Sequence, residues 1–259
     1  MAALLYGETP EFPFLLADLG TNGEFVLAVD AGRAFIASVP LGPSLEGIGL
    51  SYGGVADAGS VSGFRLGPSG LSPVVIGNTE PKRICGTGYL SLLDILLRTG
   101  FLDATGRLAA SPVSPLAARL LGTVERGGFR LEPAAARRHG ACRGRRGGNP
   151  QGQGRVSLAL ESLLAASGLE SRALARVCLG GALGEHMPET ALERLGFVPQ
   201  GLQARTAAKG NTSLCGAALL LAHPELRERL AAGVPGVCLW IWRPVPILRP
   251  CTCGIWIFG

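Results

Sequence analysis

The sequence predicts an α/β protein built on a mixed sheet, from three observations. Patterns of short strands, rich in Val, Leu, Ile and Phe, fill the N-terminal third, and helical patterns alternate with strands after it. The apolar fraction of 47% is enough to bury a substantial core. Glycine is abundant, with 39 residues, while aromatic residues make up only 6%, a balance typical of closely packed backbones. These observations favour helices layered against a sheet.

Three consecutive strands are predicted near the N-terminus, over residues 14–19, 24–30 and 33–40. The turns "TNG" and "DAG" separate them, and each supplies a glycine for the positive φ angle that a tight hairpin turn requires. The three strands therefore form an antiparallel meander.

A second strand pair is predicted over residues 60–66 and 71–76, after a Gly-rich stretch. The motif "ICGTGYLSLLDILLRTGFLD" then changes from a two-residue period to a helical one. We expect Thr87 to cap the start of this helix and Gly100 to mark its end. Its buried face is predicted to carry Leu90, Leu93, Leu96 and Leu97.

The C-terminal half alternates helices with one buried strand. "SLALESLLAASGL" predicts a helix from Ser157, and "RVCLGGALG" predicts a strand that runs into a glycine loop. "PETALERLG" predicts a helix opened by Pro188, and "NTSLCGAALLLAHP" predicts a helix capped by Asn211 or Thr212. Together with the meander, these elements give a mixed sheet with flanking helices.

Charge, cysteines and hydropathy limit the class of protein. The formal net charge of +5 is concentrated in one Arg-rich run without interleaved aromatic residues or a recognition fold, so we do not expect nucleic-acid binding. The seven cysteines are odd in number and show no pairing pattern, which favours reduced thiols. The N-terminus has no secretory leader, and the apolar stretch "GVCLWIWRPVPILRP" is too short and interrupted to span a membrane. We therefore predict a cytoplasmic protein.

Asp18 and the turn after it are the main candidate site. A carboxylate at the end of an apolar strand is costly to bury unless it meets a cation or hydrogen-bond donors. Asp18 can place Mg²⁺, and the turn of Gly20, Thr21, Asn22 and Gly23 offers N–H groups and a hydroxyl to phosphate oxygens. These residue types favour a phosphate-binding hairpin, although hairpin formation alone also explains an Asn-Gly turn. The sequence has neither a Walker lysine motif nor a G-x-G-x-x-G fingerprint.

Other candidate residues each have two interpretations. Glu46 can assist a metal ion or a water molecule at a cleft, or it can be a carboxylate that stabilises a helix start. Cys85 can be a reactive thiol near a helix N-terminus, but we favour a small buried residue beneath a tight turn. His186 is interpreted as a solvent-facing loop residue. Cys251 and Cys253 have the spacing of half a metal site, without a second half.

Several motifs in one order resemble a known family. They are "LLADLGTNGE", "LGPSLEGIGLSYGGVADAGSV", "ICGTGYLSLLDILLRTGFLD", "VCLGGALGEHM" and "KGNTSLCGAALLL". The chain is similar, from about residue 14 to about residue 230, to the C-terminal domain of the reductive activators of corrinoid proteins. The resemblance implies an actin-like, ribonuclease-H-like ATPase lobe of the ASKHA (sugar kinase, heat-shock-protein-70 and actin) type. The family carries an Arg where this chain has Ala56 and Asp57, which leaves open the anion contact that this Arg would make.

The resemblance also implies a function. Members use ATP to return an inactive cobalt(II) corrinoid protein to its active cobalt(I) state. By motif matching, Asp18 would bind Mg²⁺, the turn after it would hold phosphate, and Gly180, Gly181 and Gly184 would lie near the adenosine. The implied cofactors are ATP and Mg²⁺, and the implied partner is a corrinoid protein, with a homodimer left open.

Two parts of the family have no counterpart in this sequence. They are an N-terminal 2Fe–2S domain and a first actin-like lobe, and no C-x₄-C-x₂-C spacing of a plant-type cluster is present. We therefore expect part of an activator, inactive as an isolated chain. Two alternatives stay open: a non-catalytic nucleotide-binding or interaction lobe, and a small-molecule kinase of the same fold.

Residues 1–232 are predicted to form the actin-like lobe. Two segments change composition abruptly: residues 131–156 within the lobe, and the tail of residues 233–259. Moved on by one base, codons for "GNPQGQGRV" can spell "EILKVKAAF", which continues directly into a helix. Codons for "PCTCGIWIFG", in another frame, can spell "LYVRHMDFR". We hypothesise that base insertions or deletions altered both segments.

Overall fold

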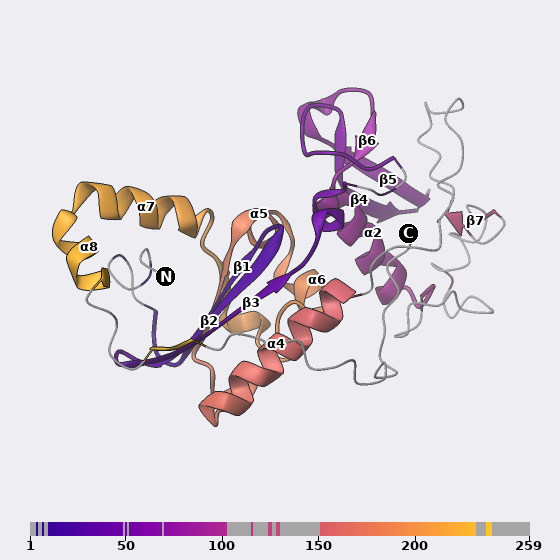
Figure 1. Ribbon diagram of the computed structural model, residues 1–259. Coiled ribbons are helices and arrows are strands. Elements are labelled where there is room, and N and C mark those ends of the chain that lie inside the picture. The colour runs from indigo at the N-terminus through magenta and orange to yellow at the C-terminus, as the bar shows by residue number, and fades with distance from the viewer. Residues whose placement is uncertain are drawn as a thin grey trace. The chain divides into compact units, whose positions relative to one another are not determined.

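The computed structural model describes residues 10–48, 52–68, 70–102, 151–231 and 237–239, together with positions 4, 7, 50, 115, 124–125 and 128–129. The chain divides into two compact units. Unit 1 comprises Met1–Leu41 and Gln153–Val245, and unit 2 comprises Gly42–Gly152 and Pro246–Gly259. Each unit has a sheet of its own (Figure 1), and the mixed α/β class predicted from the sequence is confirmed.

The predicted meander forms the middle of the sheet in unit 1. β1 (Phe14–Leu19), β2 (Asn22–Asp30) and β3 (Arg33–Pro40) pair antiparallel in chain order. β1 is buried over almost its whole length, with Phe14 and Leu19 fully covered. A strand with apolar residues on both faces is typical of the centre of a sheet that is covered on both sides.

Three later strands complete a six-stranded sheet in the order β10-β9-β1-β2-β3-β11. β9 (Arg176–Gly180) runs parallel to β1, and β10 (Thr206–Ala208) runs parallel to β9. β11 (Val237–Leu239) pairs in parallel with β3. Parallel strands therefore flank the meander on both edges, which makes the sheet mixed.

The turns of the meander differ from the prediction in one respect. Gly32 of the second turn does not adopt the predicted positive φ angle, and neither does Gly23 of the first. A Cβ on Gly23 would lie 2.9 Å from the ring of Phe25 and 3.2 Å from Leu41, so close packing favours glycine there. In the second turn, Asp30 Oδ1 accepts a hydrogen bond of 2.8 Å from the N–H of Gly32.

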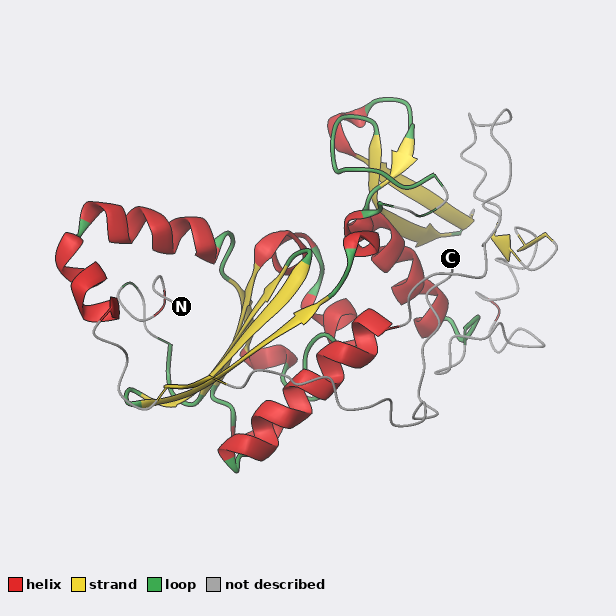
Figure 2. Cartoon of the chain, in the orientation of Figure 1, coloured by secondary structure: helices red, strands yellow, loops and turns green. Residues whose placement is uncertain are grey.

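Helices cover the sheet of unit 1. α4 (Gln151–Ser167) begins six residues before the predicted start at Ser157 and packs through Val156, Ala159, Leu160 and Leu163, spaced as one helical face. Figure 2 shows it as a long helix beside the sheet.

The glycine loop predicted after β9 is instead a short helix, α5 (Gly181–His186). Gly181 has a φ of 76°, so the chain turns from strand to helix at a single residue. α6 (Glu189–Arg194) follows Pro188, as predicted.

The last two helices of unit 1, α7 (Thr212–Ala222) and α8 (Pro224–Ala231), contact each other. Asn211 caps α7, because its Oδ1 accepts a hydrogen bond of 2.9 Å from the N–H of Leu214. This settles the choice between Asn211 and Thr212 as the cap. No helix among the described residues is long and apolar enough to cross a membrane.

Unit 2 contains a three-stranded sheet in the order β5-β4-β6. β4 (Ser60–Gly67) and β5 (Gly70–Val75) form the predicted antiparallel pair, and β6 (Arg83–Ile84) runs parallel to β4. Two short strands, β7 (Val124–Glu125) and β8 (Gly128–Phe129), pair separately. The described residues also include 3₁₀ turns: η1 (Pro43–Glu46) and η2 (Ile76–Asn78) in unit 2, and η3 (Ser171–Ala173) and η4 (Gln203–Arg205) in unit 1.

Helix α2 (Gly86–Arg98) packs on β4. It buries Leu90, Leu93 and Leu96, as predicted, whereas Leu97 is only half-buried and the prediction for it is wrong. Gly100 follows the helix with a φ of 71°. The predicted cap is wrong: Cys85 occupies the N-cap position, and no side chain caps the helix. The Thr87 hydroxyl lies instead 3.2 Å from Cys85 Sγ.

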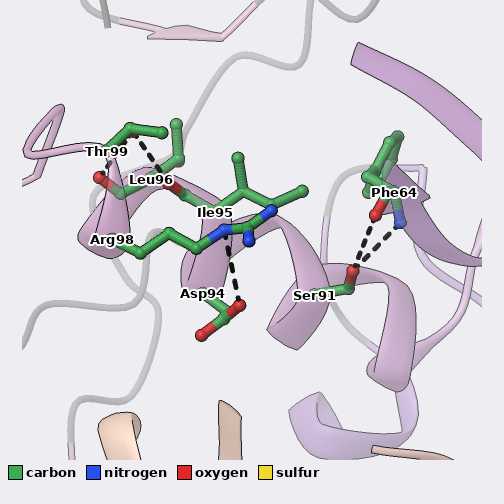
Figure 3. A network of polar contacts seen from close by, with 7 residues as sticks. All are labelled: Phe64, Ser91, Asp94, Ile95, Leu96, Arg98 and Thr99. Carbon is green, nitrogen blue, oxygen red and sulfur yellow. Dashed lines mark hydrogen bonds and ion pairs between the residues drawn. The ribbon is translucent and has the colours of Figure 1, made fainter. Parts of the chain in front are cut away.

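Ser91 of α2 ties the helix to β4 (Figure 3). Its Oγ accepts a hydrogen bond of 3.0 Å from the N–H of Phe64 and donates one of 3.5 Å to the carbonyl oxygen of Phe64. The serine hydroxyl thus bonds both backbone polar groups of Phe64, the N–H and the carbonyl oxygen.

Glycines bring backbones into direct contact at the start of α2. A Cβ on Gly86 would lie 1.6 Å from the carbonyl oxygen of Leu45, and one on Gly88 would lie 2.2 Å from that of Val61. In the same way, a Cβ on Gly53 would lie 1.9 Å from the carbonyl oxygen of Gly47. We call Gly47, Gly53, Gly86 and Gly88 the glycine crossing. The fold of unit 2 requires glycine at this crossing because no side chain fits.

Most of the two segments with unusual composition lies outside the described residues. This holds for the Arg-rich run and for Cys251 and Cys253. The described parts are the start of α4 and the strand β11. The frame hypothesis and the boundary after residue 232 stay predictions.

Candidate functional site

Asp18 lies where three segments of unit 1 meet. Because β1, β9 and β10 are parallel, their carboxyl ends lie at one edge of the sheet. Asp18 pairs with Gly180 at the ends of β1 and β9. The chain leaves β10 at the same edge and starts α7 four residues later. We call Asp18, Gly180, Gly181, Thr212 and Ser213 the Asp18 corner.

The two glycines of the corner leave room for polar side chains. A Cβ on Gly180 would lie 2.6 Å from Thr212 Oγ1 and 3.4 Å from the carboxyl carbon of Asp18. A Cβ on Gly181 would lie 2.6 Å from Asp18 Oδ1 and 2.6 Å from the carbonyl oxygen of Leu19. The carboxylate therefore occupies space that a side chain on β9 or at the start of α5 would fill.

Two hydroxyls from the start of α7 hold one oxygen of this carboxylate. Ser213 Oγ donates a hydrogen bond of 2.8 Å to Asp18 Oδ2, and Thr212 Oγ1 donates one of 3.3 Å to the same atom. Thr212 is buried, and Ser213 is exposed. These contacts join residues 194 and 195 positions apart in the chain. They link the predicted phosphate hairpin to helix α7.

A second carboxylate, Glu24, lies directly across the hairpin from Asp18. Partial burial raises the pKa of the Glu24 carboxyl, and the nearby charge of Asp18 raises it further. Like charges on directly opposed strand residues repel each other. The pair therefore favours a cation at this end of the hairpin.

The turn after Asp18 is less open than predicted. The N–H of Gly20 donates a hydrogen bond of 2.9 Å to the carbonyl oxygen of Asn22, so the expectation of a free N–H at Gly20 is wrong. The carbonyl oxygen of Thr21 accepts a hydrogen bond of 3.1 Å from the N–H of Leu41. Thr21 and Asn22 are exposed, and Gly23 is buried. Roles of Gly20, Thr21, Asn22 and Gly23 in holding phosphate stay predictions.

Two other predicted site residues, Gly184 and Glu46, make none of the contacts described above. A Cβ on Gly184 would lie 2.9 Å from the Cβ of Leu179, so this glycine allows α5 to pack closely on β9. Its contact with adenosine stays a prediction. Glu46 ends η1 in the other unit, and its role at a cleft also stays a prediction.

The cysteine and histidine candidates differ in how far they are exposed to solvent. Cys85 is 2% exposed and its Sγ lies 3.4 Å from the carbonyl oxygen of Val61, which agrees with the favoured interpretation of a small buried residue. Cys178 is buried in the core of unit 1. Cys215 of α7 is exposed, so its apolar neighbours in the sequence do not place it in a core as we expected. His186 is exposed at the end of α5.

The Asp18 corner fits a magnesium ion that also binds a ligand. Within the described residues, no three His, Cys, Asp or Glu side chains gather as a complete metal cage. Mg²⁺ in nucleotide sites, however, is commonly held by one or two carboxylates together with water and substrate phosphates. Asp18, with Glu24 opposite it and with Gly181 beside its Oδ1, provides such a partial set.

Three residues near Asp18 were not among the predicted site residues: Glu24, Thr212 and Ser213. Glu24 was within reach of sequence analysis, because residues placed symmetrically about a hairpin turn become cross-strand partners. The two hydroxyl residues carry no such signal. Thr212 was considered only as a cap, since Ser and Thr at a helix start ordinarily bond their own helix.

The family comparison matches most of the chain. Residues 13–133 and 151–234 match the family model described as the C-terminal domain of RACo, the ASKHA domain. The two matched segments include β1, β9 and the start of α7, which carry the Asp18 corner.

Relatives and a solved structure agree with this match. The corrinoid activation enzyme RamQ of Eubacterium limosum is 34% identical over 92 residues, which cover 36% of this chain and 15% of that protein. The [Co(II) methylated amine-specific corrinoid protein] reductase of Methanosarcina barkeri is 24% identical over 229 residues, covering 78% of this chain and 37% of that protein.

A solved structure, a reductive activator for corrinoid,iron-sulfur protein, superposes with a TM-score of 0.72 at 22% identity. The superposition covers 93% of this chain and 39% of the solved chain. This similarity shows that the two share a fold. The chain thus spans well under half the length of each of these proteins. Because the family model covers more than half of its residues, the chain belongs to the C-terminal ASKHA domains of the RACo-type reductive activators of corrinoid proteins.

Proposed function

We propose that the Asp18 corner binds the magnesium complex of ATP. The observation that carries the proposal is the placement of the Asp18 carboxylate at the carboxyl edge of parallel strands, between two glycine positions and the start of α7. This edge is where ligands bind in open α/β sheets. Membership of the ASKHA family supports ATP as the nucleotide.

Residues of the Asp18 corner and the neighbouring Glu24 have distinct tasks in this proposal. Asp18 holds the cation, and Glu24 adds negative charge opposite it. Gly180 and Gly181 admit a ligand close to the backbone, since neither carries a side chain. When bound, Mg²⁺ would supply the positive charge that neutralises phosphate oxygens. Gly184 and the turn of residues 20–23 are proposed as additional contacts of this ligand, and Glu46 of unit 2 is proposed to assist a metal ion or a water molecule.

We further propose that this lobe serves an activator of corrinoid proteins. The relatives are named for corrinoid activation and for the reduction of a Co(II) corrinoid protein, which supports a corrinoid protein as partner. One electron converts Co(II) to Co(I), and a 2Fe–2S cluster outside this sequence would donate it. ATP binding would favour one state of the activator and its partner, so that binding free energy offsets an unfavourable electron transfer.

Calorimetric titration of MgATP into the 259-residue chain tests the nucleotide proposal. We expect saturable binding, and we expect Asp18→Asn to weaken it by roughly tenfold or more, because a charged cation ligand is lost. Asn keeps the shape and the ability to accept hydrogen bonds from Ser213 and Thr212. In EDTA, ATP should bind both chains equally. Asp30→Asn, at the far end of β2, is the matched control and should bind MgATP like the wild type.

A second candidate function is a binding lobe that does not hydrolyse ATP on its own. It is favoured by the fact that the chain spans only 37% and 39% of two proteins that match most of it. Release of phosphate from MgATP separates the two functions. Binding without phosphate release by the isolated chain supports the binding lobe. Absence of any binding by the wild-type chain contradicts both nucleotide proposals.

A further inference from the structure

The orientation of the Asp18 carboxylate is set from outside its own hairpin. A side chain at a strand end can occupy several staggered rotamers, and the carboxyl group can rotate further. Here Ser213 Oγ and Thr212 Oγ1 both donate to Oδ2, at 2.8 and 3.3 Å. The other oxygen, Oδ1, lies toward Gly181. Oδ2 thus accepts hydrogen bonds from the two hydroxyls, and Oδ1 lies beside Gly181, which has no side chain.

The donors are themselves fixed. Asn211 caps α7 through the N–H of Leu214, so the start of the helix is capped without either hydroxyl. Thr212 is only 4% exposed, and its Oγ1 fills the space beside Gly180. Ser213 is the next residue of the same helix. The helix start therefore delivers two hydroxyls at defined positions, although neither hydroxyl is needed to cap the helix.

We propose that Ser213 and Thr212 are positioning residues that hold the Asp18 carboxylate in the orientation that receives the cation. They act through Asp18 and need no contact with the nucleotide. Hydrogen bonds to a charged group are among the stronger polar contacts in proteins. They also offset part of the repulsion that Asp18 meets from Glu24 on the opposite strand. The inference rests on the proposed function of the Asp18 corner.

The test separates carboxylate positioning from helix stability. Ser213→Ala removes the shorter contact, Thr212→Val removes the longer one at nearly constant volume, and Ser213→Thr keeps a hydroxyl. Asn211→Ala is the matched control, because it removes the cap of the same helix but no donor to Asp18. We expect Asn211→Ala to lower the unfolding midpoint and to leave the ratio of ATP affinities with and without Mg²⁺ unchanged.

The expected results for the donor variants differ from those for the control. Ser213→Ala should weaken MgATP binding roughly three- to tenfold while ATP binding in EDTA stays the same. Thr212→Val should show a smaller loss, and Ser213→Thr should restore most of the wild-type affinity. Unchanged MgATP affinity in Ser213→Ala, with a wild-type chain that binds, overturns the inference.

A ligand-free measurement keeps the two proposals apart. Three-bond NMR couplings of the Asp18 β-protons in selectively labelled chain report whether one rotamer or several are populated. We expect one rotamer in the wild type and in Asn211→Ala, and averaged couplings in Ser213→Ala. If the wild type binds no MgATP, the nucleotide proposal fails, and these couplings still decide whether the hydroxyls orient Asp18. A single rotamer in Ser213→Ala contradicts the positioning role.

Discussion

The Asp18 corner and the glycine crossing are both rich in glycine, and both lie where a helix begins. At the glycine crossing, the space of the missing side chains is filled by backbone, as where a Cβ on Gly86 would meet the carbonyl oxygen of Leu45. At the Asp18 corner, much of that space is filled by functional groups, namely the Asp18 carboxylate and the Thr212 hydroxyl. The atoms next to each glycine thus distinguish the two kinds: backbone atoms lie beside the glycines of the crossing, and polar side chains lie beside those of the corner.

The sequence motifs do not show this difference. "CGTG" and "LGGALG" are similar short glycine motifs, and both lead into helices, α2 and α5. Only the neighbours brought in from distant parts of the chain separate them. For "CGTG" these are the backbones of Leu45 and Val61, and for "LGGALG" they are Asp18 and Thr212.

The largest expected effect comes from Gly86→Ala. Its Cβ would overlap the carbonyl oxygen of Leu45 at 1.6 Å, and backbone has to move to relieve the overlap. We expect a loss of at least about 4 kcal/mol in the free energy of unfolding, measured by urea denaturation and by hydrogen exchange in α2. Gly70→Ala is the control, because no atom lies within 4 Å of its Cβ and only the φ of 105° opposes it. If Gly86→Ala lowers the free energy of unfolding no more than Gly70→Ala does, the fold does not require glycine at the crossing.

Gly181→Ala should have an intermediate effect on stability and a marked effect on the site. Alanine at a φ of 76° is strained, and its Cβ would lie 2.6 Å from both Asp18 Oδ1 and the carbonyl oxygen of Leu19. We expect about 2–3 kcal/mol of destabilisation, together with weaker binding of MgATP under conditions where the variant stays folded. Calorimetry at low temperature and urea denaturation measure the two effects. Destabilisation with unchanged MgATP affinity would place Gly181 with the glycines of the crossing.

Glu24→Gln should have the smallest effect, and its sign depends on pH. The pKa of Glu24 is raised in the folded chain, first by partial burial and then by Asp18. Ionisation of Glu24 therefore costs more in the folded state, so the stability present below the ordinary Glu pKa of about 4.3 is lost as pH rises through the folded-state pKa. We expect Glu24→Gln to be at least as stable as the wild type at neutral pH and to lose that advantage in acid.

Urea denaturation in EDTA at a series of pH values checks this prediction. In an Asp18→Asn background the benefit of Glu24→Gln should shrink, because one of the two causes of the raised pKa is removed. An equal benefit in both backgrounds would show that burial alone accounts for the effect.

Much of the fold could be predicted from local pattern. The strands of the meander, the pair β4 and β5 and most of the leucine face of α2 follow from side-chain period and turn residues, and the cap of α7 was narrowed to two adjacent residues. Two of the errors concern short segments whose residues are compatible with more than one local structure. The cap at Thr87 is wrong because Cys85 starts the helix there, and the glycine loop after β9 proved to be α5.

The sequence by itself determined the family, the mixed α/β class and Asp18 as the principal candidate, because these depend on residue types and on contacts close in the chain. Only the tertiary structure decided which groups meet Asp18. Its hydroxyl donors lie almost 200 residues away, and its glycine neighbours lie on a strand paired in parallel. Such contacts are set by sheet order and register, which no local pattern encodes. The same carboxylate is therefore an ordinary strand end in the sequence and a group bonded by two distant hydroxyls in the folded chain.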